Sequence, residues 1–286
     1  MLWRIKLLAK LILSRLPLRY QNWRSLGLFR HGDMSNPKYA LSIFDKHFKQ
    51  FLINGGQAKD STFLELGPGD TLFSAIIAHT YDVKETILLD AGAFATRSVS
   101  PYVLLFKHLK EIGLKCSDFS QYQNIDAILE ECGGVYMTEG LSSLRKIADH
   151  SVDFVFSQAV LEHIMLDEFD DYLIELSRIL KPHGIMSHRI DFKDHLGGGL
   201  NNLRFQSRIW ESSWFAKRSG FYTNRLRCSQ ILSSLQNAGF LSTIIKADRW
   251  PKQPIDKKSL PTEFIGKFSE DDLCIHGIDI VSRLKR

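Results

Sequence analysis

Residues 62–71 read Thr62-Phe-Leu-Glu-Leu-Gly-Pro-Gly-Asp-Thr71. The first five residues form a short apolar run that predicts a buried strand, and the run leads directly into a turn with glycine at positions 67 and 69. Glycine lets the backbone approach a ligand closely, and the turn presents amide groups at the start of the helix expected from Thr71. This unit therefore predicts an α/β fold with a ligand site at the turn.

Further apolar strands alternate with helical patterns along the chain. We expect strands at residues 62–66, 86–90, 135–138, 152–157, 185–192, 241–247 and 275–284, helices at 37–51, 161–180 and 229–238, and a turn over 181–184. Strands that alternate with helices usually pair in parallel through right-handed crossovers. The predicted fold class is therefore α/β, with a doubly wound sheet.

The second expected strand ends on a carboxylate, Asp90, which follows Gly69 by 21 residues. Ligands of open parallel sheets bind beyond the carboxyl ends of the strands, where an acid can accept hydrogen bonds from ribose hydroxyls. A nicotinamide-dinucleotide fingerprint would need glycine at position 72, where Leu72 stands. The turn, the acid and the strand order together predict a nucleoside-bearing cofactor. The alternative is a tight turn, with Asp90 capping the next helix.

Four motifs together resemble the class I S-adenosylmethionine-dependent methyltransferases. They are Glu65-x-Gly67-x-Gly69, Asp90, the run from Val152 to His163, and Arg178-Ile-Leu-Lys-Pro-His-Gly184. The resemblance covers residues 60–192 by motif, and His183 departs from the usual K-P-G-G turn of the family. It implies a Rossmann-like, mostly parallel seven-stranded sheet whose last strand inserts antiparallel. It also implies S-adenosylmethionine as the cofactor.

The resemblance assigns the cofactor to the first four strand ends. The turn from Glu65 to Gly69 would cradle its methionine part, Asp90 its ribose and residues 139–141 its adenine, while Gln158 and Ser157 would border the sulfonium. The expected cofactor-binding residues are Glu65, Gly67, Gly69, Asp90, Glu139, Gly140, Leu141 and Gln158. For Glu139 the alternative is a helix-capping acid, and for Gln158 it is a solvated loop residue.

Methyl transfer is an in-line displacement, so the protein must align a nucleophile, exclude water and remove a proton from a hydroxyl or amine. The candidates are histidines and acids near the ends of the fourth and fifth strands, because a buried central strand is otherwise apolar. The expected catalytic or substrate-contacting residues are His163, His188, Asp191 and His195. Alternation along the strand sends His188 and Asp191 to opposite sides. The spacing would not converge four ligands, so we expect no metal.

An aromatic segment follows the fifth strand. Gly197-Gly-Gly199 is a flexible hinge, and eight large apolar side chains, most of them aromatic, then occur within twenty residues together with four basic ones. Long aromatic loops inside a compact domain are usually functional. We therefore expect an inserted lid at residues 194–226, within a methyltransferase domain spanning 37–286. The alternative is packing against the N-terminal arm.

The N-terminal arm, residues 1–36, is basic. Its first 32 residues hold seven basic side chains and no acid, so the net charge of +5 becomes −2 once these seven are set aside. The apolar residues between Leu2 and Leu16 favour one face of a helix. Residues 1–24 are expected to lie on an anionic membrane surface. Packing on the body or on a second subunit, or a mitochondrial presequence, are the alternatives.

The expected function is methyl transfer to oxygen or nitrogen of a small-molecule, lipid-linked or saccharide acceptor. A nucleic-acid substrate is disfavoured, because the body is near neutral and the N/D-P-P-Y/F tetrapeptide is replaced by Ser157-Gln-Ala-Val160. The four cysteines are scattered, as is typical of a reducing compartment, so a cytoplasmic location with peripheral membrane contact is expected. The alternatives are a non-catalytic nucleoside-cofactor-binding module at a membrane and, third, a nicotinamide oxidoreductase.

Overall fold

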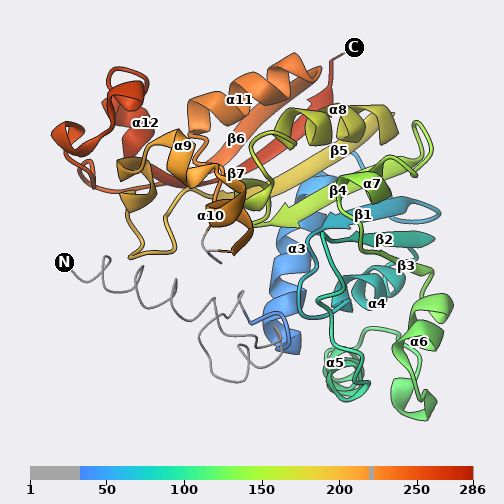
Figure 1. The fold of residues 1–286 in the computed structure, drawn as a ribbon. Helices are drawn as coiled ribbons and strands as arrows, with labels where there is room; N and C mark the ends of the chain where they lie inside the picture. The colour runs from blue at the N-terminus through green and yellow to red at the C-terminus, as the bar shows by residue number, and fades with distance from the viewer. Residues whose placement is uncertain (1–32, 219–221, 286) are drawn as a thin grey trace.

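The computed structural model describes residues 33–218 and 222–285. A seven-stranded sheet has the order β3-β2-β1-β4-β5-β7-β6 (Figure 1). The strands are β1 (Thr62–Leu66), β2 (Glu85–Leu89), β3 (Gly134–Met137), β4 (Val152–Gln158), β5 (Leu180–Asp191), β6 (Phe240–Arg249) and β7 (Ile275–Leu284). Strands β1 to β5 pair in parallel, and β7 lies antiparallel between β5 and β6. The predicted doubly wound sheet with an antiparallel insertion is confirmed.

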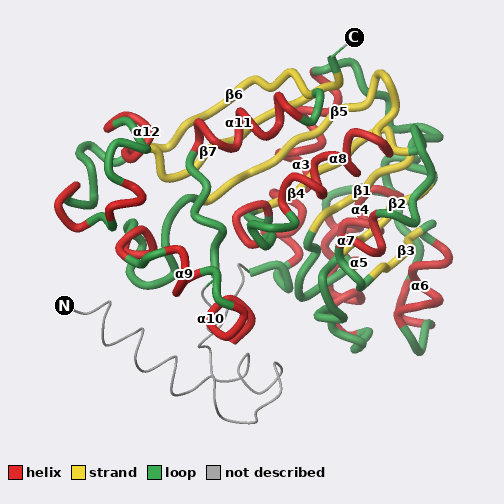
Figure 2. The backbone as a smooth tube through the Cα atoms, turned by 45° about the horizontal axis from the view of Figure 1, so that its top comes forward, coloured by secondary structure: helices red, strands yellow, loops and turns green. Residues whose placement is uncertain are grey.

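Helices cover both faces of the sheet (Figure 2). One face packs against α3 (Pro37–Ile53), α4 (Phe73–His79), α5 (Ser100–Glu111) and α6 (Ile125–Glu131). The other packs against α7 (Leu141–Leu144), α8 (Phe169–Ile179) and α11 (Cys228–Asn237). Each face has its own hydrophobic core. Burial on both faces explains why β1, β2 and β4 are almost continuously apolar.

The sequence explains where helix α3 begins and which of its faces is buried. The side chain of Asn36 accepts hydrogen bonds from the amides of Lys38 and Tyr39, and proline occupies the first helical position, where no amide donor is needed. The aromatic rings of residues 44, 48 and 51 lie on one face of the helix and are buried. Burial of one such ring contributes on the order of 1.5–3 kcal/mol. The helix is therefore held to the sheet mainly by this aromatic face.

Two boundaries predicted from the sequence are wrong. The expected helix at 161–180 is split into a short 3-10 turn, η2 (Leu161–His163), and the later helix α8. The side chains of residues 161 and 164 pack into the core before α8 begins. Two acids in the first turn of α8 favour the start of a helix there. The expected turn at 181–184 is instead part of β5. A register shift against β4 absorbs these residues.

A cap covers the end of the sheet near β6 and β7, and we define it as residues 194–218, 222–226 and 250–274. It contains η3 (Asn201–Arg204), α9 (Ser207–Trp210), α10 (Ser213–Arg218), η4 (Lys257–Ser259), η5 (Thr262–Phe264) and α12 (Glu270–Cys274) (Figure 1). Two small hydrophobic cores fill it. The sequence pattern did not predict the part between β6 and β7.

Arg225 joins the two chain segments of the cap. Its guanidinium pairs with Glu211 at 2.8 Å and lies 5.4 Å and 5.1 Å from the ring centres of Trp210 and Phe264. Trp210 is fully buried, whereas Trp214 remains 47% exposed. The segment expected as a lid is thus folded around a core of its own. Closure over an acceptor stays a prediction.

The N-terminal arm lies almost entirely outside the described residues, which begin at residue 33. Its membrane, packing and presequence interpretations therefore stay predictions. Within residues 33–218 and 222–285, no helix combines the length and the apolar character needed to span a bilayer.

Candidate active site

The glycine turn and Asp90 meet at one edge of the sheet. The Gly69 amide donates a hydrogen bond to the Asp90 carboxylate at 3.2 Å, and the Ala91 amide donates to its other oxygen at 2.7 Å. Leu66 at the end of β1 lies level with Leu89 of β2, which is why the segments after these strands are adjacent. The two expected cofactor elements therefore face one site.

Glycine is required at both turn positions. Residues 67 and 69 have φ of +66° and +70°, a region that disfavours side chains. A Cβ atom on Gly67 would also lie 2.6 Å from a methyl group of Val160, which follows β4. The turn is therefore a cradle that a side chain would fill.

The loop after β3 joins the same place. The Gly140 amide donates to the Asp90 carbonyl at 3.0 Å, and the Asp90 amide donates to the carbonyl of Met137 at 2.9 Å. Glu139, expected near the adenine, is exposed and forms an ion pair with Lys146. Leu141 begins α7 and is buried. The segments expected to bind methionine, ribose and adenine thus surround Asp90.

Glu65 is a buried acid beside the turn. Burial raises the pKa of its carboxyl to about 8, although a hydrogen bond from Ser74 lowers the pKa in part. Among the described residues, no hydrogen-bond partner is found for its Oε2 atom. The unpaired oxygen of Glu65 suits the ammonium group of S-adenosylmethionine, and the glycine turn leaves room for its methionine part. Asp90 suits its ribose hydroxyls. The residues present therefore fit the cofactor.

Gln158 and Ser157, expected near the sulfonium, turn to opposite faces of the sheet. The Gln158 amide oxygen accepts a hydrogen bond from Lys46 of α3 at 2.8 Å. The Ser157 hydroxyl is buried and lies 2.7 Å from Nδ1 of His188. The described polar contacts of both side chains are therefore with the protein scaffold.

His188 does not reach the site, which corrects the prediction that it is catalytic. It has no exposed surface and lies on the face of the sheet that α8 and α11 cover. Burial lowers its pKa to about 3, so the ring stays neutral at physiological pH. Three residues still separate it from the end of β5. A histidine sealed in the core cannot take a proton from an acceptor at the strand ends.

His163 and His195 form a pair. Their Nε2 atoms lie 3.3 Å apart, and their rings are nearly parallel, 8° apart. Nδ1 of His163 lies 3.1 Å from the carbonyl of Tyr222. A carbonyl can only accept, so Nδ1 of His163 carries the proton. In the neutral pair, Nε2 of His163 then accepts from Nε2 of His195.

Asp191 lies apart from this histidine contact. Its carboxylate forms an ion pair with Lys193 at 3.3 Å and accepts the Lys193 amide at 2.9 Å. Its own amide donates to Glu162 at 3.3 Å. Asp191 is therefore linked to His163 through Glu162, the residue that precedes His163 in the chain.

Glu162 is a site residue that the sequence reasoning missed. It is buried between the loop after β4 and the end of β5, and one oxygen accepts the Asp191 amide. Burial, and then the charge of Asp191, raise its pKa to about 8. A buried carboxyl whose pKa is raised by desolvation and by a nearby charge is typical of functional sites. Its signal in the sequence was an acid inside the run Leu161-Glu-His163, but burial is not visible there.

Metal binding finds no support in the described part of the chain. No group of three or more histidine, cysteine, aspartate or glutamate side chains is arranged there to hold an ion.

Three comparisons place the chain among known proteins. Residues 107–187 match a family model described as a methyltransferase domain. This match runs from α5 to β5, so it begins after the glycine turn and Asp90. No curated protein sequence matches the chain significantly.

Solved structures with similar folds include the YcgJ protein of Bacillus subtilis, which is 14% identical, with a TM-score of 0.47, over 85% of this chain and 99% of that one. A methyltransferase from Mesorhizobium loti is 13% identical, with a TM-score of 0.44, over 83% and 97%. Phosphoethanolamine N-methyltransferase 2 of Haemonchus contortus is 15% identical, with a TM-score of 0.46, over 85% and 53%. Similarity at this level assigns no acceptor.

The strand order, the glycine turn bonded to Asp90 and the domain match together define a methyltransferase of the Rossmann-like type. The fold and the domain match at residues 107–187 are those expected of the class I S-adenosylmethionine-dependent methyltransferases. The protein is an enzyme, and S-adenosylmethionine is its cofactor.

The raised pKa of Glu162 predicts a pH-dependent stability. The unfolded chain releases this proton near pH 4.5 and the folded chain near pH 8, so stability falls between these values as pH rises. Gln at this position keeps the acceptor oxygen but never ionises. We expect Glu162→Gln to become more stable than the wild type by up to a few kcal/mol above pH 8, and to match it near pH 4. Denaturant unfolding across this range measures the difference.

The matched control is Glu130→Gln, at an exposed acid of α6. The difference in the free energy of unfolding between Glu130→Gln and the wild type should not change with pH. A Glu162→Gln difference that is equally flat would show that Glu162 is ionised in the folded protein.

Proposed function

We propose that this enzyme transfers the methyl group of S-adenosylmethionine to an oxygen or nitrogen atom of a small-molecule, lipid-linked or saccharide acceptor. The observation that carries the proposal is the His163–His195 pair after β4 and β5, at the sheet edge that also holds the glycine turn and Asp90. An oxygen or nitrogen nucleophile must lose a proton during transfer, and a histidine can accept it near neutral pH. The near-neutral charge of the body supports an acceptor other than nucleic acid.

The chain binds the donor through its strand-end residues. When bound, S-adenosylmethionine supplies an activated methyl group on a sulfonium, so the protein need not activate the carbon. Backbone amides of the glycine turn and the Glu65 carboxyl would hold the amino-acid part, and Asp90 would accept hydrogen bonds from the ribose. Residues 139–141 would border the adenine. Val160 lies against Gly67 and limits water at the turn.

The histidine pair gives the proton a defined route. His195 takes the acceptor proton at Nδ1, because its Nε2 already donates to His163. The charge that develops on His195 is stabilised by His163, whose own proton points at the Tyr222 carbonyl. Tyr222 is held in turn, because its hydroxyl donates to Glu211 at 2.6 Å and accepts the amide of Leu166 at 2.9 Å. His195 is thus the general base, and His163 orients it.

A non-catalytic binding module is not favoured, because the chain carries a methyltransferase domain and a histidine pair suited to proton transfer. The basic arm supports a narrower proposal. Residues 1–24 bring the enzyme to an anionic membrane surface from the cytoplasm, where lipid-linked acceptors would be available.

Asp90 is expected to set donor affinity. Asp90→Ala should weaken binding of S-adenosylmethionine and of its demethylated product by about 1–3 kcal/mol, because a charged acceptor of two hydroxyl hydrogen bonds is lost. Isothermal titration measures both affinities, and NAD should not bind. Asp126→Ala, at an exposed acid of α6 that pairs with Arg97, is the control and should bind as the wild type does. Unchanged affinity in Asp90→Ala would place the ribose elsewhere.

His195 is expected to set the rate of transfer. Wild-type enzyme incubated with methyl-labelled cofactor and cell extract should label the small-molecule, lipid or saccharide fraction. His195→Gln should reduce labelling by about 10²- to 10⁴-fold below pH 8 and leave cofactor affinity unchanged, because only proton removal is lost. His183→Gln, at the exposed end of β5 away from the site, is the control. Label in nucleic acid, or full activity of His195→Gln, would contradict the proposal.

The arm is expected to carry membrane attachment. Full-length protein should float with vesicles containing anionic lipid, and protein without residues 1–24 should not, because the basic and apolar residues act together. Raising the salt concentration should weaken flotation. Equal flotation of the two proteins would end the membrane interpretation.

A further inference from the structure

Helix α3 contacts both sides of the active site. Just before its first turn, the carbonyl of Met34 accepts a hydrogen bond from the Thr71 hydroxyl at 2.8 Å. Thr71 follows the glycine turn at residues 67–69, which we call the donor turn. In its middle, Lys46 and His47 contact Gln158, the last residue of β4. The helix therefore bridges the donor turn and the strand that leads to the histidine pair.

The contact at Gln158 has a defined arrangement of protons. The Lys46 ammonium donates to Oε1 of Gln158 at 2.8 Å, and a lysine can only donate, so the shared atom is the amide oxygen. His47 must then donate to it through Nε2, at 3.3 Å. Its Nδ1 accepts from the Ser187 hydroxyl at 2.8 Å.

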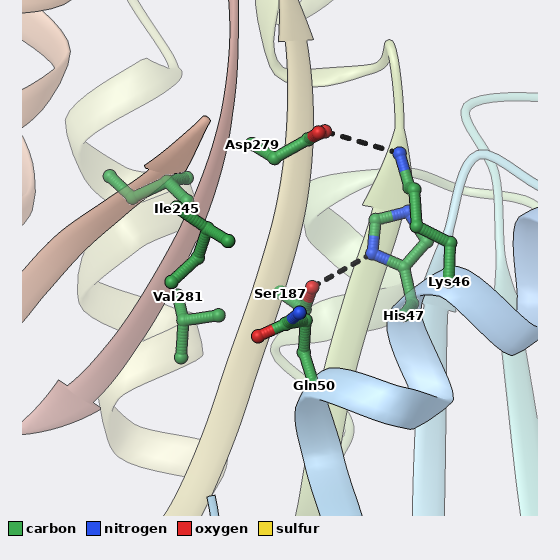
Figure 3. A pocket seen from close by; sticks show the side chains of 8 residues that line it. Lys46, His47, Gln50, Ser187, Ile245, Asp279 and Val281 are labelled. Atoms are coloured by element: carbon green, nitrogen blue, oxygen red, sulfur yellow. Dashed lines mark hydrogen bonds and ion pairs between the residues drawn. The ribbon is translucent and has the colours of Figure 1, made fainter. Parts of the chain in front are cut away.

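His47 keeps this arrangement at any physiological pH. The ring is only 1% exposed, and burial, followed by the charge of Lys46, lowers its pKa to about 3. Figure 3 shows its side chain pointing from α3 toward Ser187 of β5, and that of Lys46 toward Asp279 of β7. A neutral histidine with one donor and one acceptor matches its two partners.

Hydrogen bonds and one ring contact hold this part of the helix, since the ring centre of His47 lies 5.6 Å from that of Phe156. A cavity of about 40 Å³ lies between α3 and the sheet, bordered by Gln50, Ile245 and Val281 (Figure 3). The other aromatic contacts of α3 lie on Phe63 of β1 and on Phe154 and Phe156 of β4. The two hydrogen bonds to Gln158 are therefore the polar link between α3 and the end of β4.

The position of Gln158 determines the path of the next residues. Ala159 has a φ of +56°, and its amide donates to the Arg189 carbonyl at 2.8 Å. This turn puts Val160 against Gly67 of the donor turn and begins the loop with Glu162 and His163. A shift of Gln158 would move the acceptor side relative to the donor side.

We propose that α3 is a positioning helix, which holds the donor turn and the loop at 159–166 in fixed relation through Lys46 and His47. Both are positioning residues that act through Gln158. The inference deepens the proposed function, since the loop matters because it carries His163.

Hydrogen exchange of the full chain, with and without S-adenosylmethionine, tests the inference without an acceptor. In the wild type the cofactor should slow amide exchange at both 67–72 and 159–166. In Lys46→Met, protection should persist at 67–72 and fall by about tenfold at 159–166, because the charge-assisted hydrogen bond to Gln158 is lost together with the ion pair to Asp279. Cofactor affinity should change by less than about threefold. Adding Gln158→Leu should cause a further loss at 159–166, because it also removes the hydrogen bond from His47.

Arg283→Met is the matched control. Arg283 donates to Asn54 at the far end of α3, so its loss loosens the helix without touching Gln158. Arg283→Met should keep the cofactor-dependent protection from exchange at both 67–72 and 159–166. Equal loss in this control, or full protection at 159–166 in Lys46→Met, would overturn the inference. The exchange experiment depends on S-adenosylmethionine binding and not on methyl transfer, so its result would hold even if His195 were not the general base. Absence of cofactor-dependent protection in the wild type would contradict donor binding itself.

Discussion

The hydrogen bond from the Gly69 amide to the Asp90 carboxylate joins two loops that leave neighbouring strands, and the active site is arranged around it. The bond exists because β1 and β2 end at the same edge and because residues 67 and 69 adopt φ values open to glycine. The Asp90 backbone extends the link to Gly140 after β3. Val160 closes the turn from the β4 side, where any side chain on Gly67 would collide with it. Three strand ends are thus tied to one residue, Asp90, and the fourth is packed against them.

Burial sorts the ionisable groups of this region into two kinds. His47 and His188 have pKa values lowered to about 3, so they act as neutral hydrogen-bonding groups within the scaffold. Glu65 and Glu162 have pKa values raised to about 8, so their protonation can respond to a bound ligand near neutral pH. The first kind keeps strands and helix α3 in place, and the second lies where donor and acceptor are expected. Burial therefore lowers the pKa of the histidines that hold the scaffold and raises the pKa of the acids that lie near the expected ligands.

The sequence predicted the sheet well, because apolar runs, glycine turns and strand-end acids are local signals. Asp90 is the best example, since its position at a strand end sufficed to place it beside Gly69. His188 was misplaced because alternation gives the face of a strand but not which helices cover that face. Glu162 was missed because burial of an acid arises from contacts distant in the sequence. The same holds for the cap, where Arg225 and Phe264 meet although they lie far apart in the chain.

We propose that the glycine turn and Asp90 jointly hold one methyl donor. A crystal structure with the demethylated cofactor product tests this most directly. We expect the carboxylate of Asp90 within hydrogen-bonding distance of both ribose hydroxyls, and the methionine part against the backbone of residues 67–69. A well-ordered nucleoside bound at another edge of the sheet, with Asp90 and the turn unchanged, would contradict the account.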